Sequence, residues 1–239
     1  SLVELLVNHG ATINLQKEDG TTALMLAAQF GHNDIVSFLL EHGASINHQN
    51  KKGETALMLS TQFGHLATSM ILIHHKALID QTSREGKTAL IVACELGHNT
   101  IASLLLNKGA SVNQQDIDGI TPLMNAADNG HTALVELLLK HGAEANIQDT
   151  SGITALIGCA RNEQPTIINL LLDYGANVNH QDEDGITALM KAAKKGNLST
   201  VKILLERGAD KNIINEYGES ALDLAKENGH VTIEEKLQH

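Results

Sequence analysis

The chain has 239 residues, a formal net charge of -11 and only 2% aromatic residues, and it contains no apolar segment long enough to cross a membrane. A surplus of acidic residues argues against binding to the phosphate backbone of nucleic acids, because that contact needs a concentrated Lys and Arg surface. Residues 1–115 carry 9 acidic and 7 basic residues, and the remainder carries 19 and 10. We therefore expect neither a nucleic-acid partner nor membrane insertion.

A glycine recurs every 33 residues along the chain. These glycines are Gly20, Gly53, Gly86, Gly119, Gly152, Gly185 and Gly218. Each is followed two residues later by Thr or Ser and four residues later by Leu. A fixed period of this length is typical of stacked units that each contain two short elements. The sequence therefore predicts a repeat protein in which each unit packs against its neighbours.

The period divides the chain into one half repeat, six full repeats and a shorter final repeat. The predicted boundaries are 1–16, 17–49, 50–82, 83–115, 116–148, 149–181, 182–214 and 215–239, all within a single domain of residues 1–239. The opening SLVELLVNHGATIN matches DIVSFLLEHGASIN, the second half of the next repeat. We therefore expect a fragment of a longer protein, and a final repeat that caps the stack with polar residues such as Glu234 and Glu235.

The repeat 116–148 predicts two short helices and an extended turn. Thr121 is suited to cap a helix whose first residue is Pro122, where the missing N–H costs nothing. This first helix should end near Gly130, and the second should extend from Thr132 to Lys140. Asp and Gly at the first and last positions of 116–119 fit a type I turn.

The segment DGITPLMNAADNGHTALVELLLKHGAEAN in this repeat resembles an ankyrin repeat, and the resemblance extends over essentially the whole chain. The resemblance implies an all-α fold, a right-handed ankyrin-repeat α-solenoid of stacked helix-turn-helix units with extended β-turn fingers. It says little about chemistry, because a fold does not determine a function.

Two repeats deviate from the pattern. Glu163, Gln164 and Pro165 occupy the positions that hold Gly, His and Thr in the repeat before, and Lys76 replaces a glycine that caps the second helix elsewhere. A residue with a Cβ is disfavoured at such a cap. Either deviation is open to two interpretations, a feature used in recognition or tolerated drift.

The chain lacks the motifs of the common enzymes and of metal sites. There is no phosphate-binding GxxxxGKS loop, no GxSxG and no HExxH. Five of the 13 histidines share one repeat position: His32, His65, His98, His131 and His230. Neighbours in such a row lie about 8–10 Å apart, too far to share a zinc ion with bonds of about 2 Å. We expect no catalytic activity, no cofactor and no metal.

The two cysteines are expected to be buried and free. Cys94 and Cys159 replace the small alanines that lie between paired helices, two repeats apart. That separation is beyond the span of a disulfide, and free cysteine is among the most buried residue types. The sequence therefore predicts a reducing, intracellular and cytoplasmic location.

A row of apolar residues marks a candidate binding surface. The residue before the glycine between the two helices is Phe30, Phe63 and Leu96 in three successive repeats. On the surface of first helices and turn tips, these side chains would anchor a partner. The alternative, that they pack on neighbouring turns and complete the core, stays open here.

Further candidates lie in the later repeats. Arg161, Lys191, Lys194 and Lys195 form a predicted basic spot that would orient an acidic segment of a partner, unless they are only a solvated charged face. Ile120, Ile153 and Ile186 make three turn tips apolar, either for a partner or for stacking on one another.

These features together predict a non-enzymatic scaffold, a monomeric fragment that binds another protein or an extended peptide on its concave face. The alternative is a targeting or regulatory arm of a larger enzyme, channel or bacterial effector whose active domain lies outside this sequence. An effector of that kind would act in the host cytoplasm.

Overall fold

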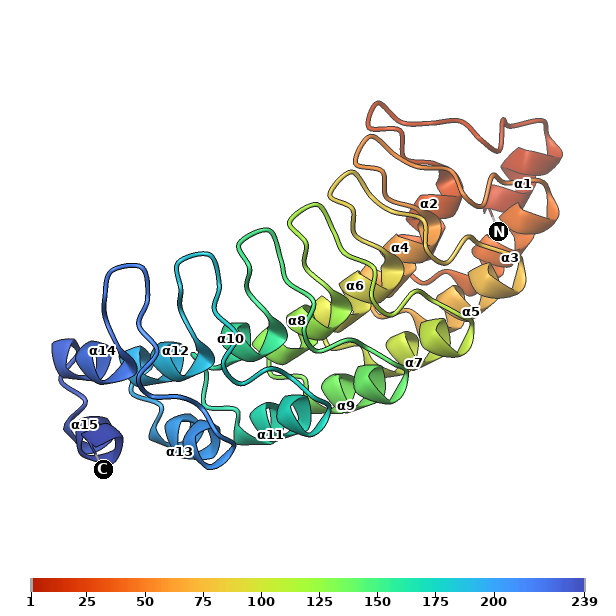
Figure 1. Ribbon diagram of the computed structural model, residues 1–239. Coiled ribbons are helices and arrows are strands. Elements are labelled where there is room, and N and C mark those ends of the chain that lie inside the picture. Colours follow the sequence, from red (N-terminus) through yellow and green to blue (C-terminus); the bar gives the residue numbers. More distant parts are fainter. Residues whose placement is uncertain (1, 239) are drawn as a thin grey trace. The chain divides into compact units, whose positions relative to one another are not determined.

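The computed structural model describes residues 2–238. Within these residues the fold consists of helices and long turns, with two isolated β-bridges and no β-strand. Its contacts divide into two compact units, residues 1–117 and 118–239. Each unit is a stack of helix pairs from which extended turns project (Figure 1). The predicted all-α solenoid of helix-turn-helix repeats is confirmed.

In its described residues, the first unit is formed by seven helices. They are α1 (Leu2–Asn8), α2 (Ala23–Gln29), α3 (Asn33–Glu41), α4 (Ala56–Gln62), α5 (Leu66–His74), α6 (Ala89–Glu95) and α7 (Asn99–Asn107). The first helices of successive repeats, α2, α4 and α6, contact one another in one row, and the second helices, α3, α5 and α7, contact one another in a second row.

The second unit, as far as residue 238, is formed by eight helices in the same manner. They are α8 (Pro122–Asp128), α9 (Thr132–Lys140), α10 (Ala155–Cys159), α11 (Pro165–Asp173), α12 (Ala188–Lys195), α13 (Leu198–Glu206), α14 (Ala221–Glu227) and α15 (Val231–Gln238). The helices α8 and α9 have the limits that the sequence predicts for the repeat 116–148.

The Thr or Ser that follows each tip glycine caps the first helix of its repeat. Thr55 Oγ1 accepts a hydrogen bond of 3.2 Å from the backbone N–H of Met58, which otherwise has no partner in the first turn. The same bond is made by Thr22, Thr88, Thr121, Thr154, Thr187 and Ser220. The recurring hydroxyl thus sets where each first helix begins.

The tips of neighbouring turns are joined by backbone hydrogen bonds. The N–H of Gly53 donates to Asn50 O at 2.9 Å and closes its own turn, while the N–H of Arg84 in the next tip donates to Lys52 O at 2.9 Å. Gly53 has φ 76°, and a Cβ there would lie 2.6 Å from Arg84 N. The glycine period therefore reflects both a left-handed backbone and the close approach of the next repeat.

Asparagine side chains join the bases of adjacent turns. Asn146 Oδ1 accepts from the N–H of Asn177 at 2.7 Å, and its Nδ2 donates to Gly175 O at 2.8 Å. Asp80 replaces Asn at this position and can only accept, and its two bonds come from the N–H and the hydroxyl of Ser111. These residues connect one repeat to the next.

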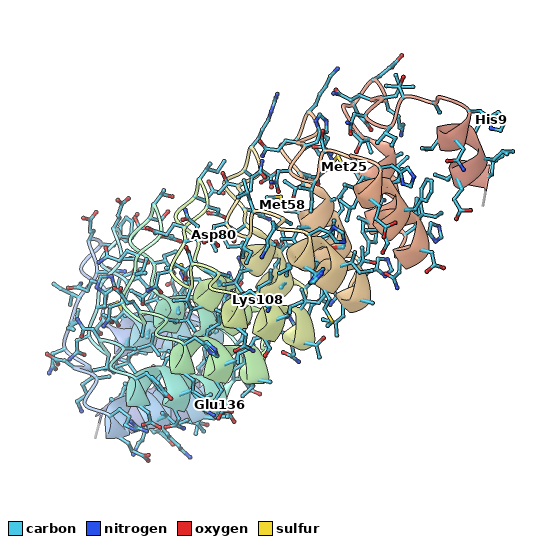
Figure 2. All side chains as sticks on the ribbon, turned by 90° about the vertical axis from the view of Figure 1, so that its right-hand side faces the viewer. His9, Met25, Met58, Asp80, Lys108 and Glu136 are labelled. Carbon is cyan, nitrogen blue, oxygen red and sulfur yellow. The ribbon has the colours of Figure 1, made fainter. Side chains whose placement is uncertain are left out.

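The core lies between the two helix rows. Met25 and Met58, at equivalent points of neighbouring repeats, are 1% and 4% exposed (Figure 2). Cys94 and Cys159 are free and buried, as predicted, and burial raises the pKa of Cys159 to about 12. Across the described residues, no helix has the length and apolar character needed to cross a bilayer.

The repeat that lacks its glycine is locally different. The helix α10 has five residues and ends at Cys159. At Gly31, Gly64 and Gly196 a histidine from the next repeat packs against the glycine, whereas at Gly130 the neighbour is Gln164. A Cβ on Gly31 would lie 2.6 Å from His65 Nδ1, and His65 Nε2 lies 2.9 Å from Gln29 O. After Glu163 the next repeat has Asn197 in place of that histidine, and Asn197 Nδ2 donates to Ala160 O. The repeat after the one that lacks the glycine thus has asparagine, which is smaller than histidine, at this position.

Candidate interaction surfaces

The predicted apolar row consists of exposed residues at the ends of first helices in the first unit. Phe30, Phe63 and Leu96 are the C-cap residues of α2, α4 and α6, and their exposed fractions are 61%, 49% and 47%. The backbone N–H of each donates to the carbonyl oxygen four residues earlier. The hydrogen bonds that close the ends of these helices are therefore made by the backbone and do not involve the three side chains. These three side chains do not belong to the buried core and are open to a partner.

A small charged hollow lies beside the last residue of the row. Its volume is about 180 Å³, and Met58, Glu85, Lys87, Glu95 and Leu96 are among its lining residues. Lys87 Nζ is 2.9 Å from Glu95 Oε2, and this hydrogen bond raises the pKa of the lysine. The positive charge of Lys87 is therefore neutralised by a carboxylate of its own repeat.

A second hollow, in the second unit, brings together four of the residues that the sequence singles out. Ile120, Ile153, Arg161 and Lys191 line a space of about 260 Å³ between first helices and turn tips. Ile186 does not line it, and neither do Lys194 and Lys195, which are exposed in the last turn of α12. The hollow has apolar lining residues and both basic and acidic ones, since Asp128 and Asp149 line it as well.

One glycine explains why this hollow exists. Gly158 lines it, and the equivalent positions of the other repeats hold larger residues: Leu26, Leu59, Val92, Asn125, Lys191 and Leu224. A Cβ on Gly158 would have as its nearest neighbour only Ile153 Cγ2, at 3.9 Å. Sequence reasoning missed Gly158, although reading this position down the repeats would have revealed it.

The predicted basic spot is partly neutralised. Arg161 forms an ion pair with Asp128 of the preceding repeat, and Asn162 Nδ2 donates to the backbone oxygen of the same aspartate. Lys191, Lys194 and Lys195 have no ion pair among the described residues. The positive charge available to a partner is therefore carried by the lysines of α12.

The histidine row has a structural role between repeats. The Nε2 atoms of His65, His98 and His230 lie 2.9 to 3.2 Å from a carbonyl oxygen at the end of the preceding first helix, which is one of the acceptors that a helix C-terminus leaves unpaired. In the described part of the chain, no three His, Cys, Asp or Glu side chains are close enough together to hold a metal ion.

Comparison with known families agrees with this architecture. The sequence model described as ankyrin repeats (3 copies) matches residues 1–50, 43–116, 111–182 and 156–238. No match to a curated protein was found. Ankyrin repeats are generally protein–protein interaction modules. Because the matches extend over nearly the whole sequence and the helix pairs follow the same period, the chain belongs to the ankyrin-repeat family.

Proposed function

We propose that this chain is a non-enzymatic scaffold that binds a partner protein or an extended peptide on the surface of its first helices and turn tips, the predicted concave face. One observation carries the proposal. Phe30, Phe63 and Leu96 are large, exposed and apolar at the same position of three successive repeats. An exposed apolar row is costly in water unless a partner covers it, and aromatic residues are frequent anchors of interfaces.

The second unit supplies a complementary contact in this proposal. The hollow opened by Gly158 has room for one apolar side chain of the partner against Ile120 and Ile153. Lys191, together with Lys194 and Lys195, would attract carboxylates on the same segment, and Ile186 extends the apolar row of tips. The free, buried cysteines support an intracellular, cytoplasmic site of action.

The test is capture of partners from cell extract, with the wild-type chain beside a Phe30→Lys, Phe63→Lys double variant. We expect the double variant to lose at least about tenfold in recovery of the main partner. The control is Val231→Lys, which changes a residue of similar exposure, 62%, outside the row. The melting temperature of every variant should stay close to that of the wild type, because each side chain is already in solvent.

Gly158→Leu tests the second unit separately. Leucine is the residue that three other repeats have at this position, so the variant should fold and fill the hollow. Partner recovery should fall without loss of thermal stability. Undiminished capture by the Phe30, Phe63 double variant, or a large drop in its melting temperature, would overturn the proposal that the row is a binding surface.

A further inference from the structure

The second full repeat has an unusual helix, α5, whose polar side chains point inward. Thr68 and Ser69 are fully buried, where other repeats mostly have Ile, Leu or Val. Ser69 Oγ is 2.8 Å from Ser60 Oγ of α4, and Thr68 Oγ1 donates to Asn33 Oδ1 at 2.7 Å. This repeat thus has hydroxyls where its neighbours have an aliphatic core.

Apolar side chains of the same repeat point outward. Met70 is 53% exposed, and Leu78, after the helix, is 57% exposed. The position of Met70 holds Ser37, Ser103, Glu136, Asn169 and Lys202 in other repeats, and that of Leu78 holds Ser45, Ser111, Glu144, Asn177 and Asp210. Among the described residues, this repeat combines a polar interior with apolar side chains on its outer surface, and burial within the stack does not account for Met70 and Leu78.

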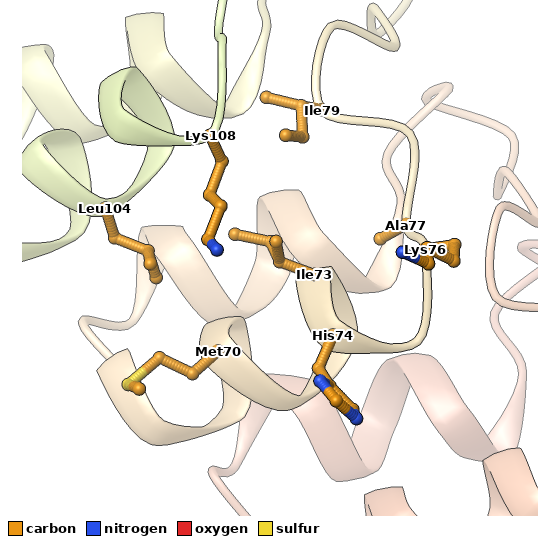
Figure 3. A pocket seen from close by; sticks show the side chains of 8 residues that line it. All are labelled: Met70, Ile73, His74, Lys76, Ala77, Ile79, Leu104 and Lys108. Carbon is orange, nitrogen blue, oxygen red and sulfur yellow. The ribbon is translucent and has the colours of Figure 1, made fainter.

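Met70 lines the outer groove, a hollow of about 500 Å³ between α5 and α7 on the side of the second helices, whereas Leu78 does not line it (Figure 3). Its lining residues are Met70, Ile73, His74, Lys76, Ala77, Ile79, Leu104 and Lys108. Met70, Ile73 and Leu104 form the apolar floor, and the side chain of Lys108 extends over it toward Ile73. The lining residues come from two neighbouring helices, α5 and α7, and from the turn after α5, and an apolar surface between two helices can receive the apolar face of a partner helix.

The charges at the groove are all of one sign. Lys76 and Lys108 line it, no carboxylate does, and within the described residues neither lysine forms an ion pair. Asp80, in the turn that follows, does not line the groove and accepts two hydrogen bonds from Ser111. The groove therefore has a basic rim around an apolar floor, although the chain as a whole has a net charge of -11.

We propose that the outer groove binds an amphipathic helix of another protein, with apolar side chains at i, i+3 or i+4, and i+7, and with Asp or Glu beside them. The apolar side chains lie on Met70, Ile73 and Leu104, and the carboxylates pair with Lys76 and Lys108. This surface is formed by second helices and is separate from the row of Phe30, Phe63 and Leu96 on the first helices.

A displayed library of random 16-residue peptides tests the proposal. Peptides are selected on the wild-type chain and counter-selected on Met70→Glu, which places a negative charge on the groove floor. We expect the recovered peptides to be helical, acidic and apolar in the stated pattern. A synthetic copy of the best one should bind at least tenfold more weakly to Met70→Glu and to Lys108→Glu, measured by fluorescence anisotropy.

Controls separate this surface from others. Ser37→Glu places the same residue, Glu, at the equivalent position of α3, outside the groove, and should leave the affinity unchanged; so should Phe63→Lys. Circular dichroism confirms that each variant is folded. Peptides that are basic or lack acidic residues, peptides that tolerate both groove variants, or a failure to recover any specific peptide would overturn the proposal. So would self-association of the wild type that Met70→Glu abolishes, since the occupant would then be a second copy.

Discussion

At the scale of single residues, Lys76 is the position where sequence and backbone conflict most. Its φ is 69°, and among the described residues it is the only non-glycine residue with a positive φ. The left-handed region costs a residue with a Cβ about 1–2 kcal/mol. The N–H of Lys76 donates to Ile73 O at 3.0 Å, so the terminal hydrogen bond of the helix is kept despite the strain.

We expect Lys76→Gly to stabilise the chain. Removing the Cβ relieves about 1–2 kcal/mol of strain, and the added freedom of glycine in the unfolded chain costs about 0.4–1 kcal/mol. The net gain in the free energy of unfolding should be about 1 kcal/mol, measured by urea denaturation. Lys76→Ala, which keeps the Cβ and removes the rest of the side chain with its charge, should give no comparable gain. Equal effects of the two variants would show that charge, not backbone strain, is at issue.

At the scale of elements, the turn tips act as a ladder because each donates a backbone hydrogen bond to the one before it. A Cβ on Gly53 would lie 2.6 Å from Arg84 N, whereas one on Gly218, in the final tip, would have no atom within 4 Å. Both glycines have φ 76°. The two positions therefore share the conformational requirement and differ only in the approach of a following repeat.

This difference yields a matched pair of substitutions. Gly218→Ala should reduce the free energy of unfolding by about 1–2 kcal/mol, the cost of the left-handed backbone alone. Gly53→Ala should cost at least about 1 kcal/mol more, since the backbone of the next tip must move as well. Urea denaturation of both variants measures the difference. If the two substitutions cost the same, the tips do not restrain one another.

At the scale of the whole molecule, stability is the sum of the repeats and of the contacts between neighbours, because each repeat touches only the next. Ser60, Thr61, Thr68 and Ser69 place four hydroxyls in the core of one repeat, and Thr61 Oγ1 has no hydrogen-bond partner there. We infer that the second full repeat is the least stable part of the first unit.

Replacing the buried serine pair should strengthen that repeat. The double variant Ser60→Ala, Ser69→Val has at both positions the residue that the preceding repeat has there, Ala27 and Val36. The added buried methyl groups should raise the free energy of unfolding by about 1–2 kcal/mol. Native-state hydrogen exchange should slow for amides of α4 and α5 and stay unchanged in α12 and α14. Faster exchange in α5 would show that the Ser60–Ser69 bond stabilises the repeat.

The repeating features were predictable from the sequence because each depends on local chemistry. Thr121 and Pro122 are residues favoured at the start of a helix, Gly130 and Gly142 are favoured after its end, and a 33-residue period is typical of stacked repeats. The buried state of Cys94 and Cys159 followed from their position among small alanines. The candidate site was less accessible: Phe30, Phe63 and Leu96 could be placed in one row, but their exposure could not be decided from their identity.

The sequence alone determined the fold, the limits of the helices in the repeat 116–148 and the absence of common catalytic motifs, because capping, turn and periodicity signals act within a few residues. The tertiary structure decided which side chains are exposed and which charges are free. It paired Arg161 with Asp128, opened a hollow at Gly158 and placed Met70 and Lys108 on one groove. These properties depend on distances between side chains of different repeats. The sequence of a single repeat, however regular, carries no information about those distances.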